Sequence, residues 1–284
     1  MLSAHLSVLS SSSRGNCSAL VIDTGESKSI YLIDCGLSPR RTLELLHALN
    51  AADIRVNGVL LTHLDADHCH AGWIAALSQQ STLHLHRVHR SRAERQGFAY
   101  VRTNVYDEAF ELCNGVTIHP ILNTHDDQGS VAFRFEFASC SQHPFTLGYA
   151  TDLGRPSREL VKHLHRVDVL ALESNYCPDM QVASKRPQFL KDRIMNGGGH
   201  LSNHESAAAA RAIAPSRHLI LLHLSLECNT PEVALRAHTR HPQAIHAPIT
   251  VSCWDKPTKW IEVAGEHLQP SIREVKPIAQ TLWG

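Results

Sequence analysis

The sequence lacks the features that would indicate a membrane, a leader peptide or an extended nucleic-acid partner. None of its 284 residues belongs to an apolar run approaching the roughly 18 residues of a membrane span. The first residues do not combine a basic and an apolar region as a signal peptide does. Its 27 basic and 27 acidic residues balance, so no global field attracts a polyanion. These absences predict a soluble cytoplasmic protein with no membrane partner.

The sequence also lacks paired cysteines and internal repeats. Its eight cysteines are scattered without a Cys-x-x-Cys pair, which argues against a zinc ribbon or a redox pair and favours reduced thiols. No repeat, low-complexity segment or linker divides the chain. An apolar fraction of 43% supports a sizeable core. We therefore predict one domain over 1–284, with 241–284, where the pattern is weaker, as a candidate C-terminal extension of it.

The most informative stretch lies at 60–72, where an apolar run leads into a cluster of metal-capable side chains. Val59 to Leu61 has the composition of a buried strand. Four candidate ligands follow it within six residues: His63, Asp65, Asp67 and His68. Residues just past such strands form the sites of layered α/β folds, and burying unpaired carboxylates is costly. The spacing predicts a divalent-metal site; the alternative is a solvated loop with incidental histidines, of which the chain has 21.

Three later strands are each predicted to end near a further candidate ligand. The strands lie at 116–122, 145–150 and 218–222. The residues that follow them are His125, Asp152 and His223. On its own, the Thr-Asp-x-Gly sequence around Asp152 is more typical of a turn. Its place in order after the other motifs favours a ligand.

A glycine-rich segment places His200 just before a predicted helix. Gly197 to Gly199 allow the backbone to approach a ligand closely. Ser202 and Glu205 have the spacing of a capping box, and a helix N-terminus presents free N–H groups to an anion. We expect a functional role for His200; the alternative is a loop histidine that only caps structure.

The motif at 63–68 resembles the first metal motif of the metallo-β-lactamase fold, His-x-His-x-Asp-His. Three of its four ligand positions match, and Asp65 stands where that family usually has histidine. Other segments are similar to the YycJ/WalJ-type exonuclease group. They are Ser-Ser-Arg-Gly-Asn at 12–16, Leu-Ile-Asp-Cys-Gly-Leu-Ser at 32–38, Glu-Ser-Asn at 173–175 and Gly-His-Leu-Ser-Asn at 199–203. The resemblance covers 6–240.

The resemblance implies an α/β fold of the metallo-β-lactamase type, an αβ/βα sandwich of two mixed sheets flanked by helices. It also implies two divalent metal ions, zinc or manganese, with iron as a further candidate. One ion takes His63, Asp65 and His125. The second takes Asp67, His68 and His223, and Asp152 bridges both. Because a carboxylate oxygen is harder than an imidazole nitrogen, Asp65 should shift the first site towards Mn²⁺, Mg²⁺ or Fe²⁺; the alternative is a lost ligand and a single metal.

The activity implied is hydrolysis of nucleic-acid or nucleotide phosphodiesters by a metal-bound hydroxide, with a 5′ exonuclease as the specific case. Asp67 and His200 are the expected catalytic residues. His200 would hydrogen-bond a phosphoryl oxygen or protonate the leaving group. Basic clusters at 87–95 and 185–193 favour a nucleic-acid partner mildly, although solvated helix faces look the same.

Two other functions remain open at this stage. The same metal site could hydrolyse a small ester, such as a cyclic phosphodiester, a lactone or a thioester, because a fold does not fix a substrate. The Asp65 departure also allows a weakly catalytic, metal-dependent binding protein. The sequence assigns no oligomeric state.

Overall fold

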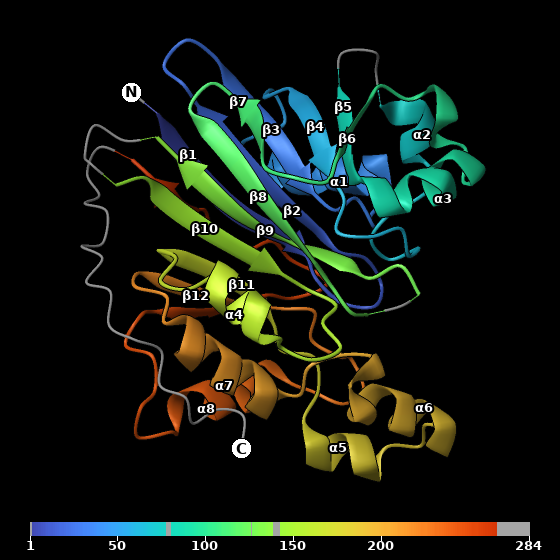
Figure 1. The fold of residues 1–284 in the computed structure, drawn as a ribbon, viewed down its shortest axis with the longest axis vertical. Helices are drawn as coiled ribbons and strands as arrows, with labels where there is room; N and C mark the ends of the chain where they lie inside the picture. Colours follow the sequence, from blue (N-terminus) through green and yellow to red (C-terminus); the bar gives the residue numbers. More distant parts are fainter. Residues whose placement is uncertain (1, 78–80, 126, 139–142, 266–284) are drawn as a thin grey trace.

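The computed structural model describes residues 2–77, 81–125, 127–138 and 143–265, which form two seven-stranded sheets packed face to face (Figure 1). The first sheet has the order β14 (Ile261–Ala264), β1 (Ser3–Ser10), β2 (Cys17–Asp23), β3 (Lys28–Ile33), β4 (Val56–Leu60), β5 (Thr82–His86) and β6 (Thr103–Tyr106). The second has the order β13 (Ile249–Val251), β12 (His218–Leu222), β11 (Val169–Glu173), β10 (Phe145–Ala150), β9 (Ser130–Phe137), β8 (Val116–Asn123) and β7 (Phe110–Cys113).

Both sheets are mixed, with antiparallel strands on one side and parallel strands on the other. Strands β1 to β3 pair antiparallel and β3 to β6 pair parallel. In the second sheet β7 to β10 pair antiparallel and β10 to β13 pair parallel. The αβ/βα sandwich of two mixed sheets is thereby confirmed.

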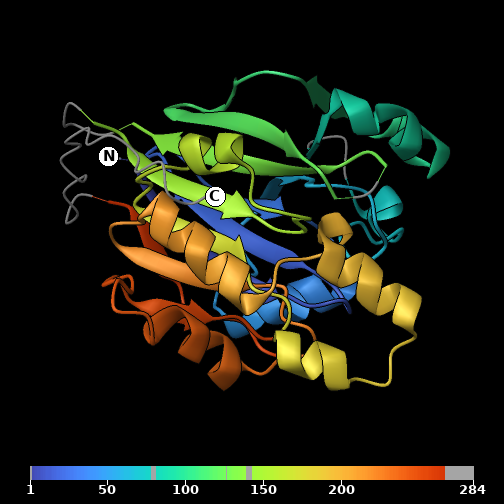
Figure 2. The same cartoon turned by 60° about the horizontal axis from the view of Figure 1, so that its bottom comes forward.

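The helices cover the outer faces of the two sheets. Beside the first sheet lie α1 (Pro39–Ala48), α2 (Trp73–Ala76), η1 (Arg87–His89), α3 (Arg90–Arg95) and η2 (Phe98–Tyr100) (Figure 1). Beside the second lie α4 (Arg158–His163), α7 (Asn203–Ile213) and α8 (Pro231–Thr239) (Figure 1). A third group, α5 (Pro178–Ala183), α6 (Gln188–Arg193) and the π-turn η3 (Ile194–Gly198), stands out from the sandwich (Figure 2).

The core follows this layering. Between the sheets, Phe133, Phe135 and Phe137 of β9 pack with Tyr149 of β10, all fully buried. A second apolar layer lies between the first sheet and α1 to α3, and a third lies between the second sheet and α4, α7 and α8. Strands covered on both faces read as continuous apolar runs, which is why β10 and β11 are buried along their whole length.

The helix caps expected from the sequence are present. Ser202 and Glu205 form the capping box that begins α7. Ser38 and Thr230 cap α1 and α8, each followed by a proline whose fixed φ suits the first helical turn. These caps satisfy backbone N–H groups that have no partner inside the helix.

Two strands, β6 and β7, and two α-helices, α4 and α5, were not predicted. They are four to six residues long, too short for a clear periodic pattern. The helix expected at 185–195 begins later, at Gln188, because a residue before proline disfavours helical geometry and Pro187 precedes the helix. It runs into the π-turn, where Gly197 has a φ of +80° that glycine adopts without strain.

Two strands fall in the segment that we considered a candidate C-terminal extension. β13 pairs parallel with β12, and β14 pairs antiparallel with β1. The segment thus supplies an edge strand to each sheet; its remainder at 266–284 lies outside the described residues. The single-domain division of 1–284 stays a prediction that these pairings favour. No helix in the described part of the chain is long and apolar enough to cross a membrane.

Candidate metal centre

The seven predicted ligands come together where strands of both sheets end. Ligand atoms of His63, Asp65 and His125 lie within 4.8 Å of one another, and we call this group the first half-site. Ligand atoms of Asp67, His68 and His223 also lie within 4.8 Å of one another, and form the second half-site. The loop after β4 contributes to both, and the ends of β8 and β12 complete them.

Asp152, which follows β10, lies between the half-sites. Its Oδ2 is 3.0 Å from Nε2 of His68 and 2.9 Å from Nδ1 of His223. Its Oδ1 is 3.6 Å from Nε2 of His125 in the first half-site. The carboxylate is buried, and the positive charge of His223 and His68 outweighs burial and holds its pKa well below the usual value. An ionised carboxylate so placed can bridge two cations.

Three residues at the site have left-handed backbone conformations just after a strand. They are Asp34, Asp152 and His223, with φ of 59°, 55° and 55°. Such conformations cost about 1–3 kcal/mol for residues other than glycine, and cluster at functional sites. Hydrogen bonds hold the turns: the N–H of Thr62 donates to Asp34 Oδ1 at 2.8 Å, and that of His223 donates to Ser11 Oγ at 2.8 Å.

The second half-site is supported from behind by buried polar groups. Nδ1 of His68 donates to Oδ2 of Asp34 at 2.7 Å, and both residues are fully buried. The hydroxyl of Thr62 also donates to Asp34, at 2.9 Å. The bond between His68 and Asp34 fixes the ring of His68 with Nε2 facing Asp152. Metal-ligating histidines are commonly held by a second hydrogen bond of this kind. From the sequence, Asp34 was noted only as part of the motif at 32–38 and was given no role, although it follows a buried strand as the predicted ligands do.

The histidines of the second half-site are poised to be positively charged. Burial alone would lower the pKa of His68, but Asp152 and Asp34 outweigh it and raise that pKa well above its usual value. Burial likewise opposes protonation of His223, yet Asp152 and Asp67 raise its pKa to about 10. For Asp67, burial is outweighed by His223 and His68, so its pKa is lowered. Without a metal, protons supply the positive charge that this cluster of carboxylates needs.

The first half-site behaves differently. Burial and the neighbouring His68 lower the pKa of His63 well below its usual value, so its ring is neutral. Nε2 of His63 is buried without a hydrogen-bond partner among the described residues, and lies 3.8 Å from Oδ2 of Asp65. An unsatisfied buried group costs about 1–3 kcal/mol, which a bound cation would remove. Nδ1 of His125 donates to the Gly199 carbonyl at 2.9 Å, so its Nε2 can act as a ligand.

Asp65 divides its oxygens between two partners. Oδ1 accepts a hydrogen bond from Nη2 of Arg92, on α3, at 2.7 Å. Oδ2 is the oxygen that faces His63. Asp65, which stands where the family usually has histidine, thus pairs with Arg92 of the basic cluster at 87–95. We expected that cluster to be either a solvated helix face or a phosphate contact.

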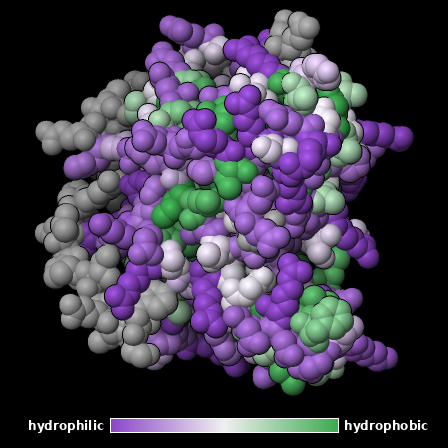
Figure 3. All heavy atoms as spheres, turned by 45° about the vertical axis from the view of Figure 1, so that its right-hand side comes forward, coloured by the Kyte–Doolittle hydropathy of each residue, from purple (hydrophilic) through white to green (hydrophobic). Residues whose placement is uncertain are grey.

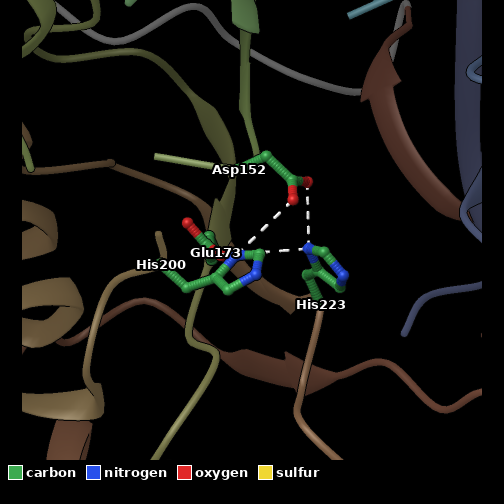
Figure 4. Close-up of side chains that lie close together, drawn as sticks. All are labelled: Asp152, Glu173, His200 and His223. Atoms are coloured by element: carbon green, nitrogen blue, oxygen red, sulfur yellow. Dashed lines mark hydrogen bonds and ion pairs between the residues drawn. The ribbon is translucent and has the colours of Figure 1, made fainter. Parts of the chain in front are cut away.

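A second cluster surrounds His200 (Figure 4). Its Nδ1 lies 2.7 Å from Oε1 of Glu173, the last residue of β11, and 3.5 Å from Oδ1 of Asp152. Glu173 is fully buried, and its other oxygen accepts the N–H of Leu153 at 2.7 Å. The sequence analysis noted Glu-Ser-Asn here but gave Glu173 no role. The strand-end rule that identified His125, Asp152 and His223 would have found it.

The donor set fits a pair of divalent cations. An unpartnered imidazole nitrogen, a carboxylate between two clusters and histidines fixed by second hydrogen bonds are what such a site requires. Imidazole and carboxylate ligands together suit zinc, manganese or iron.

Comparison with known proteins agrees with this geometry. Residues 29–224 match the beta-lactamase superfamily domain. The chain belongs to the beta-lactamase superfamily. Within it, exodeoxyribonuclease YycJ of Bacillus anthracis is 26% identical over 240 residues, covering 81% of this chain and 86% of that protein.

Comparison with solved structures also shows this fold. The metallo-beta-lactamase fold protein YhfI of Bacillus subtilis superposes with a TM-score of 0.65 at 14% identity, covering 90% of this chain and 99% of that chain. Zn²⁺-bound PqqB of Methylobacterium extorquens gives 0.63 at 16% identity, covering 90% and 99%. The resemblance inferred from the sequence is confirmed, and the fold implies divalent metal binding. The ligand roles of individual residues stay predictions.

Proposed function

We propose that the chain is a metal-dependent phosphodiesterase that acts on nucleic-acid or nucleotide phosphodiesters. The observation that carries this proposal is the position of His200, which is hydrogen-bonded to buried Glu173 and 3.5 Å from Asp152 between the half-sites. A proton donor beside a two-cation site suits an ester whose alkoxide leaving group needs a proton. The exodeoxyribonuclease relative supports a nucleic-acid substrate, although at only 26% identity.

Each half-site would hold one divalent cation, zinc, manganese or iron, with Asp152 shared between them. When bound, such a pair lowers the pKa of a water molecule and stabilises charge on the oxygens of an in-line displacement at phosphorus. The side chains present determine where these cations would lie relative to His200.

The residues of the chain supply the proton transfers. Because Glu173 accepts the Nδ1 proton of His200, Nε2 is the nitrogen that can carry a proton to the leaving oxygen. The buried carboxylate of Glu173 also stabilises the protonated ring before that transfer. The carboxylate of Asp67, in the second half-site, can accept a hydrogen bond from the attacking water and orient it.

A small-ester hydrolase is the second candidate. The zero net charge favours it, because a compact substrate needs no extended positive surface.

Figure 3 shows a mostly hydrophilic face with small apolar patches, without the large apolar surface that would indicate a protein or lipid partner there.

The test is His200→Ala, assayed with each metal on end-labelled single-stranded DNA and on an activated diester with a p-nitrophenolate leaving group. We expect unchanged metal content and a rate on DNA lower by about 10²–10⁴-fold, the usual contribution of a general acid. The activated diester should lose much less, because its leaving group needs no proton.

His204→Ala is the matched control, since His204 is an exposed histidine on α7 just after this segment. Loss of metal in His200→Ala would make His200 a ligand and overturn its assigned role. Wild-type protein that hydrolyses a lactone or thioester but no phosphodiester would establish the rival function.

A further inference from the structure

We propose that a pocket beside the second half-site binds one nucleobase of the substrate, stacked on Trp254. This inference rests on the proposed phosphodiesterase function and narrows it to substrates that carry a base next to the scissile phosphate. It adds a role for the serine-rich loop at 11–16, which also supports the second half-site.

The pocket lies directly after the last predicted ligand in the chain. Its volume is about 200 Å³, and its apolar wall consists of Leu224, Leu226, Pro231 and Trp254. Pockets for drug-sized ligands measure roughly 300–1,000 Å³, so this one suits a single ring system. Ser11 and Asp255 are among the polar residues that also line it.

One loop connects the pocket to the metal centre. Ser11 lines the pocket, and its hydroxyl accepts the N–H of His223 at 2.8 Å. The same hydroxyl donates to Oδ1 of Asn16 at 3.1 Å. Nδ2 of Asn16 lies 2.9 Å from Nε2 of His68 and 3.4 Å from Oδ2 of Asp67. The loop therefore lines the pocket through Ser11 and contacts the second half-site through Asn16, so the pocket and the half-site share one supporting segment.

Trp254 is exposed, yet its backbone is fixed. The residue is 46% exposed, while its carbonyl accepts a hydrogen bond from Ser10 Oγ at 2.9 Å. The guanidinium of Arg14 lies 4.8 Å from the ring centroid, a cation–π contact. Arg14 is not among the lining residues, so ring surface remains for the pocket. A fixed aromatic ring beside an exposed arginine is how single-stranded nucleic acids are held, by stacking and by phosphate contact.

The lining favours a base over a phosphate as the occupant. The Asp255 carboxylate would repel a phosphate, whereas it can accept hydrogen bonds from the exocyclic amino group of a base. The apolar wall matches the faces and edges of an aromatic ring. Arg14, outside the pocket, is placed for the next phosphate along the strand.

Binding is tested first on metal-free protein, by tryptophan fluorescence with dAMP and with deoxyribose 5-phosphate as probes. We expect dAMP, but not the sugar phosphate, to change the emission of wild-type protein. The change should disappear in Trp254→Phe and persist in Trp260→Phe. Trp260 is the matched control because its indole N–H donates to the carbonyl of Leu49, at the C-terminal end of α1. No base-dependent change, or one that persists in Trp254→Phe, overturns the proposal.

Activity supplies the second test, with oligonucleotides whose terminal residue either carries a base or is abasic. For Trp254→Ala, the ratio of kcat/KM on the two substrates should fall by about 10-fold, within the effect of losing one base–aromatic stack. Trp254→Phe should retain most of that ratio because phenylalanine also stacks on a base. This variant is the second one to assay if Trp254→Ala does not fold. An unchanged ratio in both variants contradicts the pocket. Base-dependent binding without any phosphodiesterase activity would instead contradict the proposed function.

Discussion

The two half-sites are built from the same residue types, but the protein supports them differently. In the second, His68 and His223 are buried, and Asp34 and Thr62 hold His68 in place. The first has an unpartnered nitrogen on His63 and a carboxylate, Asp65, that is 37% exposed and paired with Arg92 at the rim.

This contrast explains where the chain departs from the family motif. Replacing a ligand of the second half-site would leave its buried partners unpaired, and an unpaired buried charge typically costs about 3–5 kcal/mol. At the rim, water and an arginine can accommodate a new carboxylate at little cost. We therefore expect a change of residue type at a predicted ligand position to be tolerated at Asp65 but not at His68.

The largest effect should come from removing the group that both half-sites share. We expect Asp152→Ala to lose both metal ions and all detectable phosphodiesterase activity, because His68, His223 and His125 all face this carboxylate. Metal content by elemental analysis checks this. Asp127→Ala, an exposed aspartate near His125, is the control. Retention of one ion would mean that Asp152 serves only one half-site.

Metal removal should expose the difference between the half-sites through pH. The raised pKa values of His68 and His223 mean that the folded metal-free protein binds protons the unfolded chain has released. Its unfolding free energy should thus fall as pH rises from about 6.5 towards 10. The lowered pKa of His63 acts oppositely, and reduces stability as pH falls below about 6.5.

Denaturant titrations of chelator-treated and metal-loaded protein across this range measure the effect. Metal-loaded protein should show the opposite trend above neutral pH, since metal displaces protons from the same histidines. In metal-free His223→Ala protein, the unfolding free energy should fall less steeply with rising pH over the alkaline range than in metal-free wild-type protein. Identical pH profiles with and without metal would contradict the protonated state of the second half-site.

A smaller effect is expected behind His68. Asp34→Asn keeps the shape of the side chain but removes the charge that orients the ring. Groups that support metal ligands typically contribute about 10–100-fold in metal affinity. We expect a loss of that size in the second half-site with the first retained, measured by competition with a chromophoric chelator. Asp53→Asn, remote from the site, is the control; equal losses at both half-sites would show that Asp34 supports the whole loop.

The sequence identified the residues that converge at the candidate metal centre better than the groups that support them. His63, His125, Asp152 and His223 were visible because each follows an apolar run, and strand ends meet at one edge. Asp34 and Glu173 follow such runs too, but their partners lie far away in the chain: His68 is 34 residues from Asp34, and His200 is 27 residues from Glu173.

The elements of the fold also differed in how well the sequence predicted them. Long buried strands and capped helices were predictable, because periodicity and caps are local signals. The short strands β6 and β7 have weak local patterns and owe their structure to the neighbouring strands with which they pair. The Asp65–Arg92 ion pair was not predictable, since only the folded chain places α3 over the loop after β4.

That ion pair gives the smallest predicted effect. In Arg92→Ala, Asp65 loses the contact that orients it, and we expect the affinity of the first half-site for Mn²⁺ to fall about 2- to 5-fold, the size of a partly exposed ion pair. Arg90→Ala is the matched control, because Arg90 lies on the same helix and pairs with Glu94 instead. In an Asp65→His background, where the imidazole should shift preference towards Zn²⁺, removing Arg92 should have no such effect. Metal titrations of the four proteins in this cycle give the coupling directly. If Arg92→Ala binds Mn²⁺ more tightly, the guanidinium opposes the cation and does not position Asp65 for it.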